Sequence, residues 1–362
     1  MKWQIAVLGG DGVGPEVTEA SLAVLQATAE RFGHEFTADV QDVGFAAYER
    51  SGHPLPEETL AACHNADAVL LGAVGDPRSE GVSVELRPEA ALLALRKEMG
   101  CYANLRPVRL LPVLASASPL RPEIVAGTDL VIVRELAGGL YYSEPRGPVE
   151  DGQGAVDTMK YHQDEVARIA RMAFEAARGR RKCVLSVDKA NVLHSSRLWR
   201  RVVDEIAEEY PDVECSHMLV DRAAMELVLN PSSFDVMLTP NLFGDVLSDE
   251  AAAVIGSIGL LASASIGSGG GIFEPVHGSA PDIAGTGTAN PLAIILSAAL
   301  LLRHVYSLNV EATAIESAVE QVLEDGLRTR DLVQDGEAAV GTEEMGRAVA
   351  AMISNVEASA DA

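Results

Sequence analysis

The chain has 362 residues, of which 48% are hydrophobic, and it carries 53 acidic against 28 basic residues, for a net charge of −25. This length allows two domains and a sizeable core, whereas the acidity argues against nucleic acid, whose phosphates are bound by clustered lysine and arginine. No apolar stretch reaches membrane-spanning length without a polar interruption, and the first residues run into a strand pattern without the features of a signal peptide. We therefore expect a cytoplasmic protein with no nucleic-acid partner and no membrane partner.

The first hundred residues predict alternating strands and helices. The expected strands are 4–10 and 66–75, and the expected helices are 15–33 and 87–100. Between the first strand and the first helix lies a glycine-rich turn, GGDGVGPE. Its spacing fails the dinucleotide-binding pattern G-x-G-x-x-G, because Pro15 stands where the last glycine is required. The turn therefore argues against a Rossmann domain.

From about residue 128 onward, short apolar strands repeatedly end in polar or charged residues, with helical patterns between them. The residues at or just beyond these strand ends are Arg134, Lys189, Asp221 and Asn241. Alternating strands and helices indicate α/β layers, and ligands of such proteins bind beyond the carboxyl ends of the strands. We therefore expect one shared site at these ends.

The region after residue 255 changes character. Residues 256–271 are rich in glycine, serine and alanine, and we expect them to form a loop, followed by a second irregular stretch. Residues 292–306, LAIILSAALLLRHVY, predict a buried helix that is too short to cross a membrane.

Two aspartates, Asp245 and Asp249, stand four residues apart in NLFGDVLSDEAAA and share one face of the helix expected there. Their charges repel one another unless water solvates them or a cation bridges them. Carboxylate oxygens suit Mg²⁺ or Mn²⁺, and Asp221, at the end of a neighbouring strand, could complete a metal site. A solvated acid pair on the protein surface is the alternative interpretation.

Three arginines, Arg96, Arg106 and Arg134, lie beside apolar residues. Guanidinium groups bind carboxylates with two parallel hydrogen bonds, so these side chains are candidates for binding an acidic ligand. Structural ion pairs with the many acids of the chain are the alternative.

Three further positions could take part in proton transfer. Lys189 follows a buried strand, where a dry environment can lower its pKa and make it a base; a surface lysine is the alternative. Tyr141 and Tyr142 follow a glycine pair, and a phenol there could donate a proton, although packing would explain either tyrosine.

The segment EPVHGSAPDIAG, residues 274–285, combines His277 and Asp282 with small residues that allow a cofactor to approach the backbone closely. An acid can bind a ribose diol and would repel a 2′-phosphate. A histidine that only makes a local hydrogen bond in a loop is the alternative.

Seven blocks of the sequence resemble the isocitrate/isopropylmalate family of β-decarboxylating dehydrogenases. They are GDGVGPEV, RPEAALLALR, ANLRPV, RELAGGLYYSEPRG, SVDKANVL, NLFGDVLSDEAA and FEPVHGSAPDIAGTGTANP, in unbroken order between about residues 4 and 350. The resemblance implies an α/β fold of two domains, isopropylmalate-dehydrogenase-like, with a mixed sheet and no Rossmann domain. Residues 1–101 with 256–362 would form the first domain, with the cofactor loops. Residues 102–255 would form the second, with the metal and substrate residues and a dimer interface.

The same resemblance implies an activity. We expect NAD-dependent oxidative decarboxylation of 3-isopropylmalate to 4-methyl-2-oxopentanoate and CO₂ in leucine biosynthesis, with Mg²⁺ or Mn²⁺ bound. Homoisocitrate, isocitrate or tartrate is the alternative substrate. The enzyme would be a homodimer whose active sites are shared between the subunits.

Roles for individual residues follow from the resemblance. Arg96, Arg106 and Arg134 would bind the substrate carboxylates. The metal would be held by Asp221, Asp245 and Asp249, with one or two of them supplied across the dimer interface. Lys189, from the partner subunit, would assist deprotonation of the hydroxyl together with Asp221, and Tyr141 would protonate the enol. The NAD site would be lined by Glu274, His277, Gly278, Ser279, Ala280, Asp282, Ile283 and Asn290.

Two further features concern specificity. Glu89, Leu92 and Leu93 occupy the specificity segment of the family, where leucines suit a branched alkyl group. Asp282 and Ile283 stand where NADP-dependent members commonly carry Lys and Tyr, which favours NAD.

The sequence departs from the family pattern at Asp76, where glycine is usual, and at Ala262, where proline is usual. Asp76 adds a charge near the expected nicotinamide end of the cofactor. Two rival functions remain, a catalytically silent subunit and a metal-dependent hydrolase. The first would have lost an arginine, the lysine or an aspartate, and the second would not need the segment 274–285.

Overall fold

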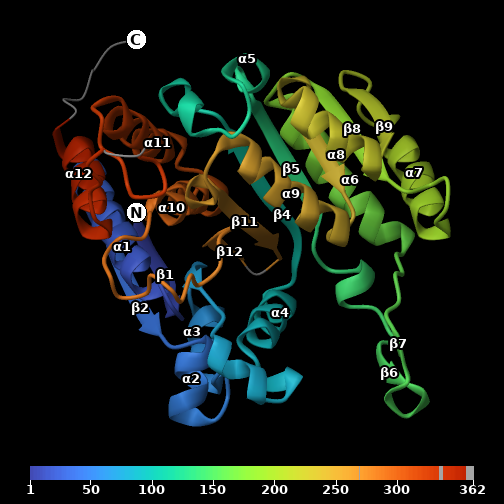
Figure 1. The fold of residues 1–362 in the computed structure, drawn as a ribbon, viewed down its shortest axis with the longest axis horizontal. Helices are drawn as coiled ribbons and strands as arrows, with labels where there is room; N and C mark the ends of the chain where they lie inside the picture. The colour runs from blue at the N-terminus through green and yellow to red at the C-terminus, as the bar shows by residue number, and fades with distance from the viewer. Residues whose placement is uncertain (269, 334–336, 356–362) are drawn as a thin grey trace. The chain divides into compact units, whose positions relative to one another are not determined.

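The computed structural model describes residues 1–268, 270–333 and 337–355. The chain divides into two compact units, Met1–Gly100 with Ser257–Ala362, and Cys101–Gly256. From the sequence, we predict divisions after residues 101 and 255. Each unit combines a sheet of both parallel and antiparallel strands with helices (Figure 1), so the mixed α/β fold that we expected is confirmed.

The described residues of the first unit form five strands in the order β2-β1-β3-β12-β11. Their bounds are β1 Lys2–Gly10, β2 Glu35–Gln41, β3 Ala68–Ala73, β11 Ala262–Gly267 and β12 Gly270–Pro275. All neighbours are parallel except the hairpin pair β11 and β12. Because β3 is buried along its whole length, its continuous apolar run AVLLGA fits the centre of the sheet.

Helices of the first unit supply most of its apolar core. They are α1 Gly14–Phe32, α2 Gly44–Ser51, α3 Glu57–Asn65, α4 Pro88–Glu98, α10 Leu292–Val305, α11 Asn309–Glu324 and α12 Thr342–Asn355. Helix α10, expected from its apolar run, is buried on almost every side and packs on β11 and β12. Within the described residues, we find no helix of the length and apolar character needed to span a membrane.

The loop predicted for residues 256–271 is wrong in its second half. Residues Ala262–Gly267 form β11, which pairs with β12 from Ala262 opposite Pro275 to Gly267 opposite Gly270. Alternating small residues hide the strand pattern in the sequence. The strand is stabilised instead by burial and by long-range pairing, since Ile272 and Phe273 of β12 lie opposite Val69 and Leu70 of β3.

The main sheet of the second unit has five strands in the order β4-β5-β10-β8-β9, in addition to a separate hairpin of two strands. Their bounds are β4 Cys101–Arg109, β5 Asp129–Glu135, β8 Cys183–Asp188, β9 Glu214–Leu219 and β10 Val236–Thr239. Only β4 runs antiparallel to its neighbour. The helices are α5 Pro122–Val125, α6 Gln163–Arg178, α7 His194–Ala207, α8 Val220–Leu229 and α9 Asn241–Ile255. The hairpin of β6 Gly147–Val149 and β7 Gly154–Val156 extends away from this unit as a narrow ribbon (Figure 1).

Two residues expected at or just beyond strand ends, Asp221 and Asn241, lie in the first turns of helices. Strand β9 ends at Leu219 and helix α8 begins at Val220, so Asp221 occupies the first turn of α8. Asp221 thus lies near the N-terminus of α8, where an acid interacts favourably with the helix dipole.

The turn after β5 is held by a buried carboxylate. Glu135, 1% exposed, accepts hydrogen bonds from the backbone N–H groups of Ala137, at 2.7 Å, and Gly138, at 3.0 Å. Gly139 follows with a φ of +71°, and a Cβ there would lie 2.2 Å from the Tyr161 hydroxyl, so only glycine fits. The turn leads directly into the short 3₁₀ helix Gly139–Tyr141.

This carboxylate makes folding stability depend on pH. Burial raises the pKa of Glu135 from 4.5 to about 7, although the two N–H donors oppose the shift. The folded chain therefore holds a proton that the unfolded chain releases, so this stabilisation is present below pH 4.5 and is lost as the pH rises through 7.

We expect Glu135→Gln to remove this dependence. Between pH 5 and pH 8, the unfolding free energy of the wild type should fall relative to that of the variant by on the order of 3 kcal/mol. Urea unfolding of both proteins across this range measures the difference. Glu19→Gln, on the exposed side of α1, is the control. If the unfolding free energies of the wild type and Glu135→Gln changed with pH in parallel, the raised pKa of Glu135 would be contradicted.

Candidate functional site

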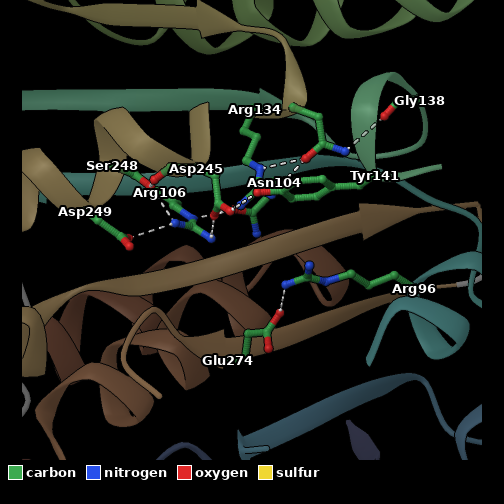
Figure 2. Close-up of polar contacts among 11 residues, drawn as sticks. Arg96, Asn104, Arg106, Arg134, Gly138, Tyr141, Asp245, Ser248, Asp249 and Glu274 are labelled. Atoms are coloured by element: carbon green, nitrogen blue, oxygen red, sulfur yellow. Dashed lines mark hydrogen bonds and ion pairs between the residues drawn. The ribbon is translucent and has the colours of Figure 1, made fainter. Parts of the chain in front are cut away.

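Five of the predicted site residues meet in the second unit. Arg106 comes from β4, Arg134 from β5, Tyr141 from the 3₁₀ helix that follows, and Asp245 and Asp249 from helix α9 (Figure 2). We call these five residues the acid–arginine cluster. The strands bring the arginines to one face because Asn104 lies opposite Arg134 in the register, and Arg106 is two residues further along β4.

Asp245 is the centre of the cluster. Its carboxylate pairs with Nη1 of Arg134, accepts a hydrogen bond of 2.7 Å from the Tyr141 hydroxyl, and lies 3.6 Å from Nη2 of Arg106. The guanidinium of Arg134 also lies over the Tyr141 ring, 5.6 Å from its centroid. Burial, and then the hydrogen bond to Asp245, raise the pKa of Tyr141 to about 12. The phenol is therefore protonated at neutral pH and has a proton to donate.

Arg106 connects the two aspartates of helix α9. Its Nη1 lies 3.5 Å from the carboxylate of Asp249 and also donates to the hydroxyl of Ser248. Arg106 is 6% exposed and Arg134 is 1% exposed. Charged groups are seldom buried to this extent without partners of opposite sign. Two cations and two anions thus stabilise one another at the carboxyl end of β5.

The donor set of helix α9 fits a hard divalent cation. Asp245 and Asp249 place carboxylate oxygens one helical turn apart, and Asp249 is exposed to solvent. Mg²⁺ and Mn²⁺ prefer such oxygens and keep positions open for water or substrate. However, within residues 1–268, 270–333 and 337–355, three or more acids, histidines or cysteines nowhere lie close enough to hold a metal ion.

The third predicted metal ligand, Asp221, lies elsewhere in the chain. Its carboxylate forms an ion pair with Nζ of Lys189, and the hydrogen bond from this lysine holds the pKa of Asp221 below its usual range. The backbone of Lys189 is fixed in turn, because its N–H donates to the Ser196 hydroxyl at 3.0 Å. Within one chain, the ion pair of Lys189 with Asp221 is therefore separate from the acid–arginine cluster.

The third predicted arginine lies in the first unit. Arg96, on α4, donates a hydrogen bond of 2.7 Å to Glu274 of β12, and both side chains are buried (Figure 2). Glu274 had been predicted to line the cofactor site, and its pairing with Arg96 was not foreseen. On the same helix, Leu92 and Leu93 are half-buried and Glu89 is exposed.

A cavity in the first unit collects most of the predicted cofactor residues. It has a volume of about 460 Å³, and its lining includes His277, Gly278, Ala280, Ile283 and Asn290. Ser279 lies beside the glycine-rich turn, where its carbonyl accepts a hydrogen bond of 2.8 Å from the N–H of Val13. Burial lowers the pKa of His277, so its imidazole is neutral at pH 7. Asp282 is exposed.

Several residues of this cavity were missed by the sequence analysis. Val13, Ile258, Arg330 and Asp331 also line it. Asp331 accepts a hydrogen bond of 3.0 Å from the side-chain amide of Asn290, which fixes that predicted residue in the wall of the cavity. Only contacts between distant segments bring these residues here. The sequence feature that came closest to indicating one of these residues is the turn GGDGVG. It contains Val13, whose N–H contacts the carbonyl of Ser279.

Both departures from the family pattern have a local structural role. Asp76 caps the 3₁₀ helix Pro77–Gly81, accepts from the N–H of Arg78 at 2.8 Å, and forms an ion pair with that side chain. This partner lowers the pKa of Asp76, so its charge is compensated within the turn. Ala262 begins β11 and is buried. Strand pairing therefore continues to this residue.

Comparison with known proteins identifies the family. A sequence model described as isocitrate/isopropylmalate dehydrogenase matches residues 4–349. The chain is 57% identical over 346 residues to a 3-isopropylmalate dehydrogenase of Geobacillus kaustophilus, covering 95% of this chain and 93% of that protein. It is 52% identical over 346 residues to a 3-isopropylmalate dehydrogenase of Aquifex aeolicus, covering 95% of both chains.

Solved structures agree with this result. An isocitrate dehydrogenase from Methylococcus capsulatus is similar with a TM-score of 0.83 and 38% identity, over 98% of this chain and 99% of the other. A β-decarboxylating dehydrogenase from Thermococcus kodakarensis gives a TM-score of 0.78 and 37% identity, over 97% and 96% of the two chains. The chain is an oxidoreductase that belongs to the isocitrate/isopropylmalate dehydrogenase family.

Proposed function

We propose that this enzyme catalyses the NAD-dependent oxidative decarboxylation of 3-isopropylmalate to 4-methyl-2-oxopentanoate and CO₂, a step of leucine biosynthesis. The acid–arginine cluster is the observation that carries the proposal, because it combines groups for binding a small diacid with groups for binding a divalent cation. The names of the relatives described above support the choice of substrate.

Arg106 and Arg134 bind the carboxylates of the substrate in this proposal. Arg96, for which the family resemblance implies the same role, belongs to the first unit. Planar guanidinium groups suit this task because each can donate two parallel hydrogen bonds to one carboxylate. Leu92 and Leu93 present half-buried apolar side chains that suit the isopropyl group, and Glu89 belongs to the same helix.

The acids of the cluster serve a different purpose. Asp245 and Asp249, with Asp221 of the partner subunit, would hold Mg²⁺ or Mn²⁺. A bound divalent cation polarises the oxygens of a hydroxy acid and stabilises negative charge that develops on them, and bound NAD accepts a hydride. Lys189, oriented by its ion pair with Asp221, assists removal of the hydroxyl proton. Tyr141, whose phenol is protonated at neutral pH, returns a proton to carbon after CO₂ has left.

The cavity of the first unit is the proposed binding site for NAD. Its small residues permit close approach of a nucleotide, and neutral His277 adds no positive charge that would favour a further phosphate. Asp282, exposed near the cavity residue Ile283, would bind the ribose diol and repel the 2′-phosphate of NADP.

The proposed homodimer is supported by an apolar stripe on helix α8. Met225 and Leu229 are 63% and 62% exposed, and they follow Asp221 at intervals of four residues, so all three share one face of the helix. Val246, on helix α9, is 61% exposed. A second copy that covers this stripe would bury Asp221 and its partner Lys189 in the interface. We place the enzyme in the cytoplasm, consistent with its four cysteines, which stand far apart in the sequence without a CxxC pair.

The activity and its metal requirement can be tested together. NADH should form from 3-isopropylmalate with added Mg²⁺ or Mn²⁺, and chelation should abolish it. Asp245→Asn should lower kcat by at least about a hundredfold, because a neutral amide binds divalent cations poorly. NADH absorbance with 3-isopropylmalate, homoisocitrate, isocitrate and tartrate ranks the substrates by kcat/KM. A higher value for any of the other three acids would reassign the substrate.

Cofactor choice should follow the charge at residue 282. The double variant Asp282→Lys with Ile283→Tyr should raise the ratio of kcat/KM for NADP to that for NAD by at least about tenfold, because lysine attracts the 2′-phosphate that aspartate repels. Glu30→Lys, an equal change of charge in the last turn of α1, is the control and should leave the ratio unchanged. An unchanged ratio in the double variant would contradict the role of Asp282.

Shared sites predict complementation between two inactive variants. Lys189→Ala and Asp245→Asn should each be inactive, whereas their purified heterodimer contains one intact site, so a statistical mixture should recover roughly a quarter of the wild-type activity. Asp245→Asn mixed with Asp249→Asn is the control, because every site would then lack one acid of helix α9. Heterodimer formation is verified with two affinity tags, and an inactive heterodimer of the first pair would refute sharing.

A further inference from the structure

Two buried asparagines hold the arginines of the acid–arginine cluster. Asn241, the first residue of helix α9, accepts hydrogen bonds from Nε of Arg134 at 3.0 Å and from its Nη2 at 2.8 Å. Asn104, on β4, accepts from Nε of Arg106 at 2.7 Å. Both asparagines are fully buried, at 0% exposure. The Nε side of each guanidinium is thus occupied by an amide oxygen within the protein.

The amide of Asn241 has an unambiguous orientation. Its oxygen faces the guanidinium of Arg134, which has only donors, and its nitrogen donates to the carbonyl of Gly138 at 3.1 Å. Its backbone N–H donates to the Tyr161 hydroxyl at 2.9 Å. The side chain of Asn241 therefore joins helix α9 to strand β5, which carries Arg134, and to the turn that leads into Tyr141.

The use of amides here differs from the way other arginines in the chain are held. Arg200 donates from Nε and Nη2 to the buried carboxylate of Asp188 at 2.8 and 2.9 Å, and Nε of Arg180 donates to the buried Asp235 at 2.9 Å. Carboxylate partners bind a guanidinium more strongly than amides do, and this chain has 53 acidic residues. The two arginines of the cluster nevertheless have neutral partners on their Nε side.

We propose that Asn104 and Asn241 are positioning residues that orient Arg106 and Arg134 without adding a further negative charge beside them. A carboxylate at either position would hold the guanidinium more strongly, but it would add a negative charge that repels an acidic substrate. An amide oxygen fixes which edge of the guanidinium points away from the cluster. Of the remaining nitrogens, Nη1 of Arg134 and Nη2 of Arg106 face Asp245, and Nη1 of Arg106 faces Asp249. This inference rests on the proposed function, because it presumes an anionic substrate.

The test compares a charged and a neutral replacement at the same position. Asn241→Asp keeps the shape and the accepting oxygen but adds a negative charge, and Asn241→Ala removes the anchor. Both should raise KM for 3-isopropylmalate by about tenfold or more, with a smaller change in kcat. Asn104→Asp should behave in the same way through Arg106. A purely structural asparagine would instead lower the melting temperature and leave KM unchanged.

A double-mutant cycle shows whether Asn241 acts through Arg134. In the Arg134→Ala background, Asn241→Ala should not raise KM further, whereas independent effects would multiply. Thr239→Val is the matched control, because Thr239 is fully buried in the preceding strand and its hydroxyl has no hydrogen-bond partner among the described residues. This control should keep both KM and kcat.

Crystal structures separate this inference from the proposed function. In the wild type, the Asn241 oxygen should lie within hydrogen-bond distance of Nε of Arg134, and in Asn241→Ala the guanidinium should rotate. This result does not depend on which acid the enzyme oxidises, so a failed 3-isopropylmalate assay would overturn only the function. Unchanged KM values in Asn104→Asp and Asn241→Asp, or an Arg134 side chain that does not move in Asn241→Ala, would overturn the positioning role.

Discussion

The mutual compensation of two cations and two anions at the carboxyl end of β5 is the constraint on which the second unit depends. Asp245 and Asp249 repel one another on one helix face, and Arg106 and Arg134 are two buried positive charges on adjacent strands. Unit charges 4 Å apart interact by about 4 kcal/mol at an effective dielectric constant of 20. The desolvation of two guanidinium groups costs a comparable amount. The two buried guanidinium groups therefore depend on the acids, whereas Asp249 is also solvated by water because its side chain is exposed.

This constraint also explains the supporting structure around the cluster. Helix α9 must begin close to β5, and the hydrogen bonds of Asn241 to Arg134 and Gly138 fix that approach. The turn after β5 must place Tyr141 against Asp245, and the buried carboxylate of Glu135 holds its backbone. A buried acid whose pKa is about 7 is a cost to stability at neutral pH. This destabilising group lies in the segment that leads to Tyr141, the proposed proton donor.

Several residues of this site were predictable from the sequence, because their positions follow from local helix and strand periodicity. The spacing of four residues placed Asp245 and Asp249 on one face, and the apolar strand that ends in Arg134 placed that residue at the site edge of the sheet. Long-range pairing was not predictable. The strand β11 is composed of small residues, so its identity depends on β12 and, through it, on β3. Likewise, the sequence shows Asn104 and Asn241 but not which donors they would accept.

Charge pairing also explains why one chain does not gather the three predicted metal ligands. Lys189 and Asp221 satisfy each other, so neither requires the acid–arginine cluster for its own stability. Exposed apolar side chains lie next to this ion pair, since Met225 and Leu229 share the helix face of Asp221. In the proposed dimer, the hydrophobic effect would favour burial of this stripe. The ion pair of Lys189 with Asp221 would then also lie in the interface. Association would then be driven by the apolar residues of helix α8, whereas the chemistry would depend on Asp221 of the same helix and on its partner Lys189. A substitution at Met225 or Leu229 would therefore change activity through assembly, without contact with substrate.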